Sequence, residues 1–196
     1  MNFDQNLIAP ALGVLGLFIV VIIYQWITKQ DGGSGAVKKI GEQIHIGAIV
    51  FMKREYKMIS ICALVLLVLL YIFLGAASAL CFLVGAVTSA TAGYIGMNTA
   101  TIANVRTAQA AHDNGSASAL TVAFFGGAVM GLSVAALGLL GLGGLYYFFG
   151  AEHSEALHGF AMGGSVVALF SRVGGGIFTK SADVGADLVG KLEAGI

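Results

Sequence analysis

Charged residues are scarce in this chain of 196 residues. Lysine, arginine, aspartate and glutamate make up 10% of the sequence, whereas hydrophobic residues make up 58%. A soluble globular domain usually has about a quarter of its residues charged, so the composition excludes an ordinary soluble domain. The ten basic residues balance the ten acidic ones, which leaves no overall positive field to attract nucleic acid. We therefore expect a protein of the lipid membrane with no nucleic-acid partner.

Proline and cysteine are also rare. Proline occurs once, and the two cysteines, Cys62 and Cys81, lie in apolar stretches. Their spacing fits neither a metal site nor a disulfide framework, so we interpret both as small packing residues. Glycine, in contrast, occurs 29 times. In an apolar sequence, abundant glycine favours helices that pack backbone to backbone, which predicts a bundle of several helices rather than a single anchor.

Long apolar runs predict five transmembrane spans. The predicted spans cover residues 7–28, 58–76, 77–98, 117–149 and 157–179. The fold class is therefore predicted to be all-α, a polytopic transmembrane helix bundle, with residues 1–196 forming a single membrane domain. The second and third spans should form an antiparallel hairpin, because little more than residues 75–78 joins them. The first span has no basic leader and is longer than a signal peptide needs, so we expect it to be retained.

All ten basic residues fall on one side of this predicted topology. They lie in segments 29–57, 99–116 and 180–196, and at the end of the fifth span. The opposite side has no basic residue but carries Asp4, Glu152, His153 and Glu155. The positive-inside rule then places the N-terminus outside and the C-terminal end in the cytoplasm. In a bacterium this would be a multi-pass protein of the inner membrane. Residues 37–51 have a helical apolar rhythm, which predicts an interfacial helix that runs into the second span.

Charged residues near the C-terminus share one face of a predicted helix. At about 100° per residue, four of them fall within an arc of about 80°: Lys180, Asp183, Asp187 and Lys191. Arg172 lies near the same arc about two turns deeper in the span. Glu193 falls outside the arc.

The residue types on this arc suit a magnesium-bound phosphate compound. Asp183 and Asp187 are one helical turn apart, and Mg²⁺ typically takes one or two carboxylates together with phosphate oxygens and water. Lys180 and Lys191 flank them, and lysine binds phosphate as a mobile point charge. The alternative is a solvated helix end with salt bridges between residues four apart, which contribute only about 0.2–0.5 kcal/mol per pair.

Three glycines and an arginine precede the charged arc. Gly174, Gly175 and Gly176 would each cost a helix about 1 kcal/mol, so a simple anchor would not favour them, and they permit close approach by a neighbouring backbone. Arg172 lies where the span changes from apolar to polar, and an ionisable residue at membrane depth is by default a functional candidate. Its alternative role is to extend toward the lipid interface. The string GGGIFTK lacks the glycine that precedes lysine in a P-loop, so a Walker-type NTPase is not predicted.

Three segments of the chain closely resemble the membrane-bound, ion-translocating inorganic pyrophosphatases. They are ALFSRVGGGIFTKSADVGADLVGKLEAGI at 168–196, GYIGMNTATIANVRTAQAA at 93–111 and GAIVFMKREYK at 47–57. The second segment suits a tightly packed helix that extends past the membrane, although its Arg106 would also serve as a simple topology anchor.

The resemblance implies an enzyme that hydrolyses magnesium pyrophosphate in the cytoplasm and moves H⁺ or Na⁺ across the membrane. Members of this family have about sixteen membrane helices and act as homodimers, and some need K⁺ as well as Mg²⁺. This chain resembles the N-terminal third, so the water-activating carboxylates would lie beyond it, no catalytic residue is assigned within it, and it should be inactive alone.

The resemblance also implies roles for the charged residues. Lys180 would bind pyrophosphate, and Asp183 and Asp187 would bind the Mg²⁺ ions that carry it. Lys191 and Glu193 match positions close to the same site, and we place Lys191 among the substrate ligands. Arg172 matches an arginine below the substrate pocket that couples hydrolysis to ion movement.

Two other hypotheses remain open at the level of sequence. One is a non-catalytic membrane bundle that binds magnesium phosphates or assists the assembly of a larger complex. The other is a secondary transporter for an anion, which would need broken helices near the middle of the membrane. The glycine run at 174–176 is the one feature that suggests such a break.

Overall fold

The computed structural model describes residues 5–150 and 154–195, and the regular structure within them is entirely helical, with a loop at residues 29–34. The elements are a short 3-10 turn η1 (Gln5–Leu7), the α-helices α1 (Ile8–Thr28), α2 (Gly35–Leu74), α3 (Ala76–Asn114), α4 (Ser116–Phe149) and α5 (Ser154–Val189), and a terminal π-helical turn η3 (Gly190–Ala194). Asp4, Glu152 and His153, which are predicted to lie on the side without basic residues, are outside the described residues.

Five helices are long and apolar enough to cross a membrane. The prediction of an all-α, polytopic membrane bundle is therefore confirmed, and the chain is an integral, multi-pass membrane protein. Several helices are longer than a span requires. In particular, α2 has 40 residues and runs unbroken from Gly35 to Leu74, so the segment 37–51 is the first half of the same helix as the second predicted span.

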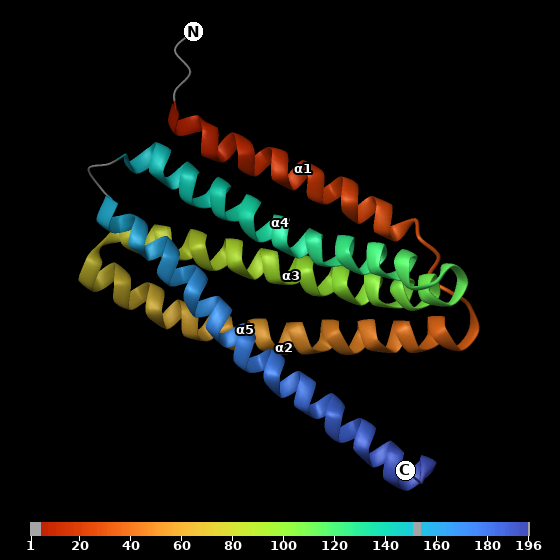
Figure 1. Cartoon of the computed structure of the whole chain (residues 1–196). Helices are drawn as coiled ribbons and strands as arrows, with labels where there is room; N and C mark the ends of the chain where they lie inside the picture. The colour runs from red at the N-terminus through yellow and green to blue at the C-terminus, as the bar shows by residue number, and fades with distance from the viewer. Residues whose placement is uncertain (1–4, 151–153, 196) are drawn as a thin grey trace.

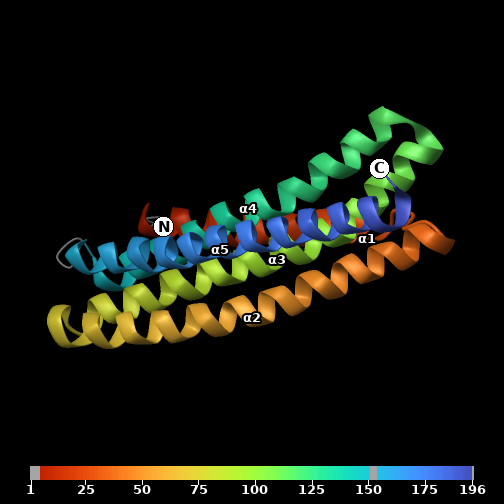
Figure 2. The ribbon, with the colours of Figure 1, turned by 90° about the horizontal axis from the view of Figure 1, so that it is seen from below.

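The helix α3 lies at the centre of the bundle. It contacts α2, α4 and α5, whereas α1 packs mainly on α4. Figures 1 and 2 show α2 and α4 on opposite sides of α3. Phe82 and Thr99 of α3, Ile27 of α1 and Val129 of α4 are fully buried. The bundle is thus organised around α3, which holds the other helices in place.

Single glycines make the two tightest connections. Gly75 joins α2 to α3 with φ of 89°, and Gly115 joins α3 to α4 with φ of 82°. A positive φ is poorly tolerated by residues with a Cβ atom, which explains glycine at both positions. The predicted hairpin between the second and third spans is present, and its connection is one residue rather than the four expected.

Glycine also allows α3 and α5 to approach closely. A Cβ atom on Gly159 would overlap the carbonyl oxygen of Ser78, and one on Gly163 would overlap that of Phe82. From the other side, a Cβ on Gly85 would overlap the carbonyl oxygen of Phe160. The backbones of the two helices therefore touch, as the abundance of glycine predicts.

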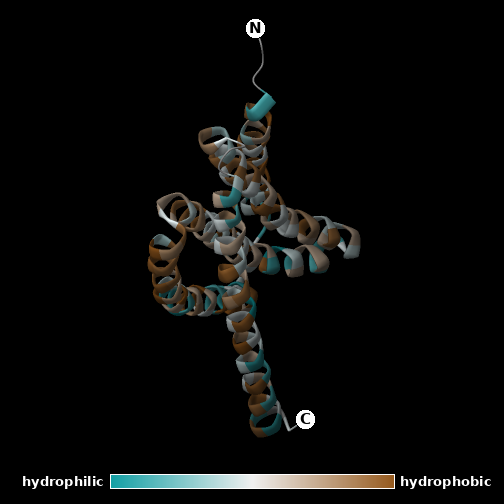
Figure 3. Cartoon of the chain, turned by 90° about the vertical axis from the view of Figure 1, so that its left-hand side faces the viewer, coloured by the Kyte–Doolittle hydropathy of each residue, from teal (hydrophilic) through white to brown (hydrophobic). Residues whose placement is uncertain are grey.

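Large apolar side chains cover much of the outer surface. Phe73 is 77% exposed and Phe148 is 83% exposed, and Figure 3 shows hydrophobic residues around the outside of the helices. A water-soluble monomer rarely presents such a continuous apolar surface. The surface therefore suits lipid or further membrane helices.

Candidate functional site

The C-terminal part of α5 leaves the bundle and carries the predicted charged residues. Figure 1 shows α5 crossing α2 and then projecting beyond the other helices. Every residue from Ser181 to Val189 is exposed, and so is Lys180. Within the described residues, no ion pair joins a lysine of this segment to an aspartate. The ion pair that these residues do contain lies in α3, between His112 and Asp113. The alternative of a salt-bridged helix end therefore finds no support in this arrangement.

The charged residues lie on the side of α5 that faces away from α2. Taking Gly174, which touches α2, as the reference, Phe178 and Val167 fall within about 40° of it at about 100° per residue. Both also pack against α2 residues. Arg172, Lys180, Asp183 and Asp187 fall between about 160° and 240°. The structure thus holds α5 by one face and leaves the charged face open.

Lys191 and Glu193 follow a different winding from the other charged residues. They belong to the π-helical turn η3, which begins at Gly190. A π-helix bonds each residue to the fifth rather than the fourth along the chain, so the spacing of 100° per residue applies only as far as Val189. Asp183 and Asp187 therefore stay on one helix face. The spacing of 100° per residue does not place Lys191 on the same arc.

The arginine at the end of the fifth span faces a groove between three helices. Arg172 lines this groove together with Ser89 of α3, Gly138 of α4 and two serines of α5, Ser165 and Ser171. Serine hydroxyls are the polar groups that a membrane bundle uses to satisfy one another across helices. The arginine therefore lies between the bundle and its exposed end, rather than within the buried core.

The glycine run of α5 is helical throughout. The helix continues from Ser154 to Val189 without a break at Gly174, Gly175 or Gly176, so the broken helix that an anion transporter would need is absent here. The close approach that these glycines permit comes from a side chain rather than a backbone. At Gly174 the neighbour is the carboxyl of Glu55, whereas nothing lies within 4 Å of the Cβ positions of Gly175 and Gly176.

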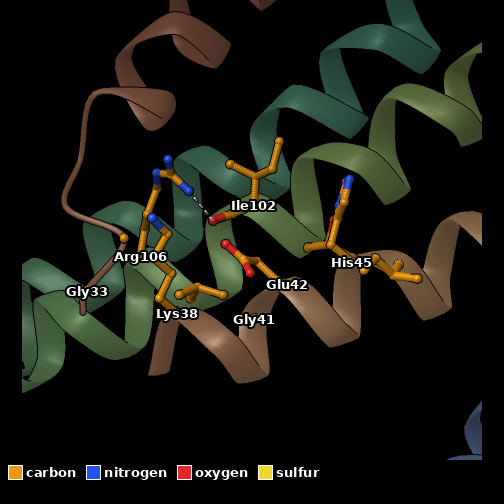
Figure 4. Close-up of a pocket in the computed structure, with 11 residues that line it drawn as sticks. Gly33, Lys38, Gly41, Glu42, His45, Ile102 and Arg106 are labelled. Carbon is orange, nitrogen blue, oxygen red and sulfur yellow. Dashed lines mark hydrogen bonds between the residues drawn. The ribbon is translucent and has the colours of Figure 1, made fainter. Parts of the chain in front are cut away.

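A second polar pocket lies between α2, α3 and the loop that joins α1 to α2. Figure 4 shows Lys38, Glu42, His45 and Arg106 around it. Arg106 donates hydrogen bonds to the carbonyl oxygens of Thr28 and Ile102, both at 3.1 Å. Arg106 is thus more than a topology anchor, because it ties the end of α1 to α3. Sequence reasoning did not find this pocket, since its residues are polar in isolation and gather only when the helices pack.

The histidine of this pocket has a defined hydrogen-bond role. Thr101 donates its hydroxyl hydrogen to the carbonyl oxygen of Asn98 at 3.0 Å, and His45 Nδ1 lies 2.8 Å from the same hydroxyl oxygen. A threonine hydroxyl has a single hydrogen, so it must accept the second bond. With the Thr101 hydrogen on the Asn98 carbonyl, Nδ1 of His45 is the donor of the bond to Thr101.

The acidic residues of α5 do not form a complete metal site by themselves. Among the described residues, no group of three or more histidine, cysteine, aspartate or glutamate side chains gathers to hold a metal ion. The two aspartates on one face of α5 supply hard oxygen ligands, and magnesium accepts a small number of carboxylates when phosphate and water complete its coordination. The donor set fits Mg²⁺ only if a ligand supplies further oxygens.

The comparison with protein families identifies the chain. The model of the inorganic H⁺ pyrophosphatase family matches residues 14–196. The chain belongs to this family. The resemblance of the three sequence segments to these enzymes is therefore confirmed over nearly the whole chain.

Individual members of the inorganic H⁺ pyrophosphatase family are similar over most of this chain. A protein of Clostridium tetani, provisionally named a K⁺-stimulated pyrophosphate-energized sodium pump, is 51% identical over 94% of the chain. K⁺-insensitive pyrophosphate-energized proton pumps of Methanosarcina mazei and Moorella thermoacetica are 47% and 46% identical, each over 96% of the chain. The chain spans about 28% of the length of the curated relatives it matches. The chain is thus similar to sodium pumps and to proton pumps alike.

Proposed function

We propose that this chain forms the N-terminal part of a pyrophosphate-energized ion pump, which hydrolyses magnesium pyrophosphate on the cytoplasmic side and moves H⁺ or Na⁺ across the membrane. Family membership supports the class of activity. The observation that carries the proposal is the open charged face of α5, which lies opposite the face that packs on α2. A helix with this arrangement suits one wall of a site whose other walls come from further helices.

Lys180 and Lys191 are the proposed ligands of pyrophosphate, and Asp183 and Asp187 the proposed ligands of Mg²⁺. All four side chains are exposed, so a polyanion can reach them without displacing an internal partner. Magnesium would neutralise negative charge on the phosphoryl oxygens as the bond to the leaving phosphate breaks. Glu193 lies two residues beyond Lys191 and is proposed to border the same site.

Arg172 is the proposed link between hydrolysis and ion movement. It lies about 12 Å along the helix from Lys180, at 1.5 Å per residue, and it lines the groove between α3, α4 and α5. Ionisable residues at this depth commonly mark ion pathways. A movement of α5 when Lys180, Asp183 and Asp187 bind their ligands would reach Arg172, because all four residues belong to this one continuous helix.

No residue of this chain is proposed to activate the attacking water, so the chain alone should not hydrolyse pyrophosphate. We propose that the full-length pump acts as a homodimer in the lipid membrane, with K⁺ as an additional cofactor if it resembles the K⁺-stimulated relatives. The charged C-terminal part of α5 would face the cytoplasm.

Replacing one aspartate of the charged face tests the proposal. The full-length pump with Asp183→Ala should lose at least about 100-fold in magnesium-dependent pyrophosphate hydrolysis, because the substrate metal loses a ligand and the phosphoryl group its position. Hydrolysis is measured as phosphate release from purified protein at several Mg²⁺ concentrations.

Asp113→Ala is the matched control. Asp113 is also an exposed aspartate, but it lies at the end of α3 and pairs with His112, so its loss should leave hydrolysis within about twofold of wild type. Undiminished activity in Asp183→Ala, or an equal loss in both variants, would refute the site on α5.

A further inference from the structure

The contact between α2 and α5 includes three layers on one face of α2. The rings of Phe51 and Phe178 lie 4.8 Å apart between centroids. The carboxyl of Glu55 lies against Gly174, and Ile59 belongs to the same buried cluster as Val167. The three α2 residues are four positions apart, which places them on a single helix face. Together they hold α5 just before it leaves the bundle.

Glu55 is the one charged side chain in these three layers. Its Oε1 atom is buried and has no hydrogen-bond partner among the described residues. A buried polar group without a partner weakens the folded state, whereas an apolar side chain would fill the same space between the two apolar layers without this cost. Stability alone therefore does not account for a glutamate here.

Gly174 is the counterpart that makes room for this carboxyl. A Cβ atom at Gly174 would overlap Glu55 Oε1 and would lie 2.9 Å from its Cδ atom. The next glycine differs, because nothing lies within 4 Å of the Cβ position of Gly175. The pairing of Glu55 with Gly174 is thus specific to one position of the glycine run.

This contact lies between the two functional parts of α5. Gly174 is two residues beyond Arg172 and six residues before Lys180. Because α5 is a continuous helix over this stretch, a shift or rotation at Gly174 moves both residues together.

We propose that Glu55 is a positioning residue of the pump, whose carboxyl against Gly174 sets the depth and rotation of α5 and thereby the placement of Arg172 and Lys180. This inference rests on the proposed function. Glu55 itself does not touch the substrate, since it packs on the face of α5 opposite the charged residues.

A double-mutant cycle in the full-length pump tests the proposal. Gly174→Ala should raise the KM for magnesium pyrophosphate about threefold, because the added methyl group displaces the flexible carboxyl of Glu55 from its place against α5. Glu55→Ala should raise KM about threefold by freeing α5. The double variant should resemble Glu55→Ala within about twofold, since the added methyl group then has space.

Two further variants complete the design. Gly175→Ala makes the same chemical change at a position with open space in this chain, and it should stay within about twofold of wild type. Glu55→Gln keeps the size and shape of the side chain and should also stay within about twofold.

The proposal is overturned if Gly174→Ala is equally harmful with and without Glu55, if Gly175→Ala is as harmful as Gly174→Ala, or if Glu55→Gln matches Glu55→Ala. An unchanged KM with lower kcat would also overturn it, since a fold defect reduces only the amount of active protein. If the wild-type pump lacked hydrolysis, the proposed function would fail. The melting temperatures would still test the contact, since Gly174→Ala should lower the value and the double variant should restore it.

Discussion

Arg106 closes the C-terminal end of α1. The last four carbonyl groups of a helix have no partner within it, and Arg106 donates to one of them, the carbonyl of Thr28, from a position 78 residues along the chain. Its second hydrogen bond goes to Ile102 in its own helix, which fixes the direction of the guanidinium group. Arg106 therefore adds a hydrogen bond between α1 and α3, beside the one from Asn98 to the hydroxyl of Tyr24.

Removing this guanidinium should weaken the folded pump. Arg106→Ala loses a charged hydrogen bond and leaves the Thr28 carbonyl without that partner, which we expect to lower the free energy of unfolding by about 1–3 kcal/mol. Denaturant unfolding of the purified protein in detergent measures the change. Arg54→Ala is the control, because Arg54 is exposed and its loss should change stability by less than about 0.5 kcal/mol. Equal stability of the two variants would contradict the role of Arg106.

Sequence reasoning reached some of these residues and not others. Lys180, Asp183 and Asp187 could be placed on one face because helical periodicity is a local property of the chain. The contacts of Glu55 and Arg106 could not be predicted, because each depends on which distant helix lies alongside. A lone glutamate in a basic stretch and a lone arginine after an apolar span give no signal of their own.

At the scale of helices, glycine decides which faces of α3 and α5 meet. Gly163 has no room for a side chain, whereas the nearest atom to a Cβ on the adjacent Gly164 would be the carbonyl oxygen of Gly85 at 3.9 Å. The two neighbours therefore offer a matched pair with opposite expectations.

Gly163→Ala should destabilise the bundle, and Gly164→Ala should not. At Gly163 the methyl group must displace the backbone of Phe82, and such overpacking typically costs about 1–3 kcal/mol. At Gly164 the change should be neutral or should stabilise by up to about 1 kcal/mol, since alanine favours the helix. Thermal unfolding in detergent compares the two. A lower melting temperature for Gly164→Ala than for Gly163→Ala would contradict the packing described.

The helices themselves were predictable, but their ends were less so. Apolar runs marked each predicted span because lipid requires about 20 apolar residues. The amphipathic rhythm of residues 37–51 did predict a helix that runs into the second span, and α2 is one helix from Gly35 to Leu74. The apolar runs did not show the π-helical turn at Gly190, because a change in winding leaves no mark in hydrophobic periodicity.

For the whole molecule, the alternation of helices gathers the basic residues at one end. Figure 1 shows the α1–α2 loop and the α3–α4 connection near one end of the bundle, and the α2–α3 hairpin near the other. The segments that carry lysine and arginine lie at the first of these ends. The positive-inside rule predicts that this end faces the cytoplasm, which would put the charged face of α5 on the side where pyrophosphate is proposed to bind.

Cysteine labelling of the full-length pump tests this orientation. In a full-length background from which every cysteine has been removed, including Cys62 and Cys81, single cysteines replace three exposed residues, Asp31, Ser116 and Ser154. A maleimide that cannot cross the membrane should label the first two only in inside-out vesicles, since they lie in predicted cytoplasmic segments, and the third only in right-side-out vesicles. The reverse pattern would invert the orientation. Labelling of Asp31→Cys and Ser116→Cys from opposite sides would refute the predicted topology, because two helices, α2 and α3, separate them and should return the chain to the same side.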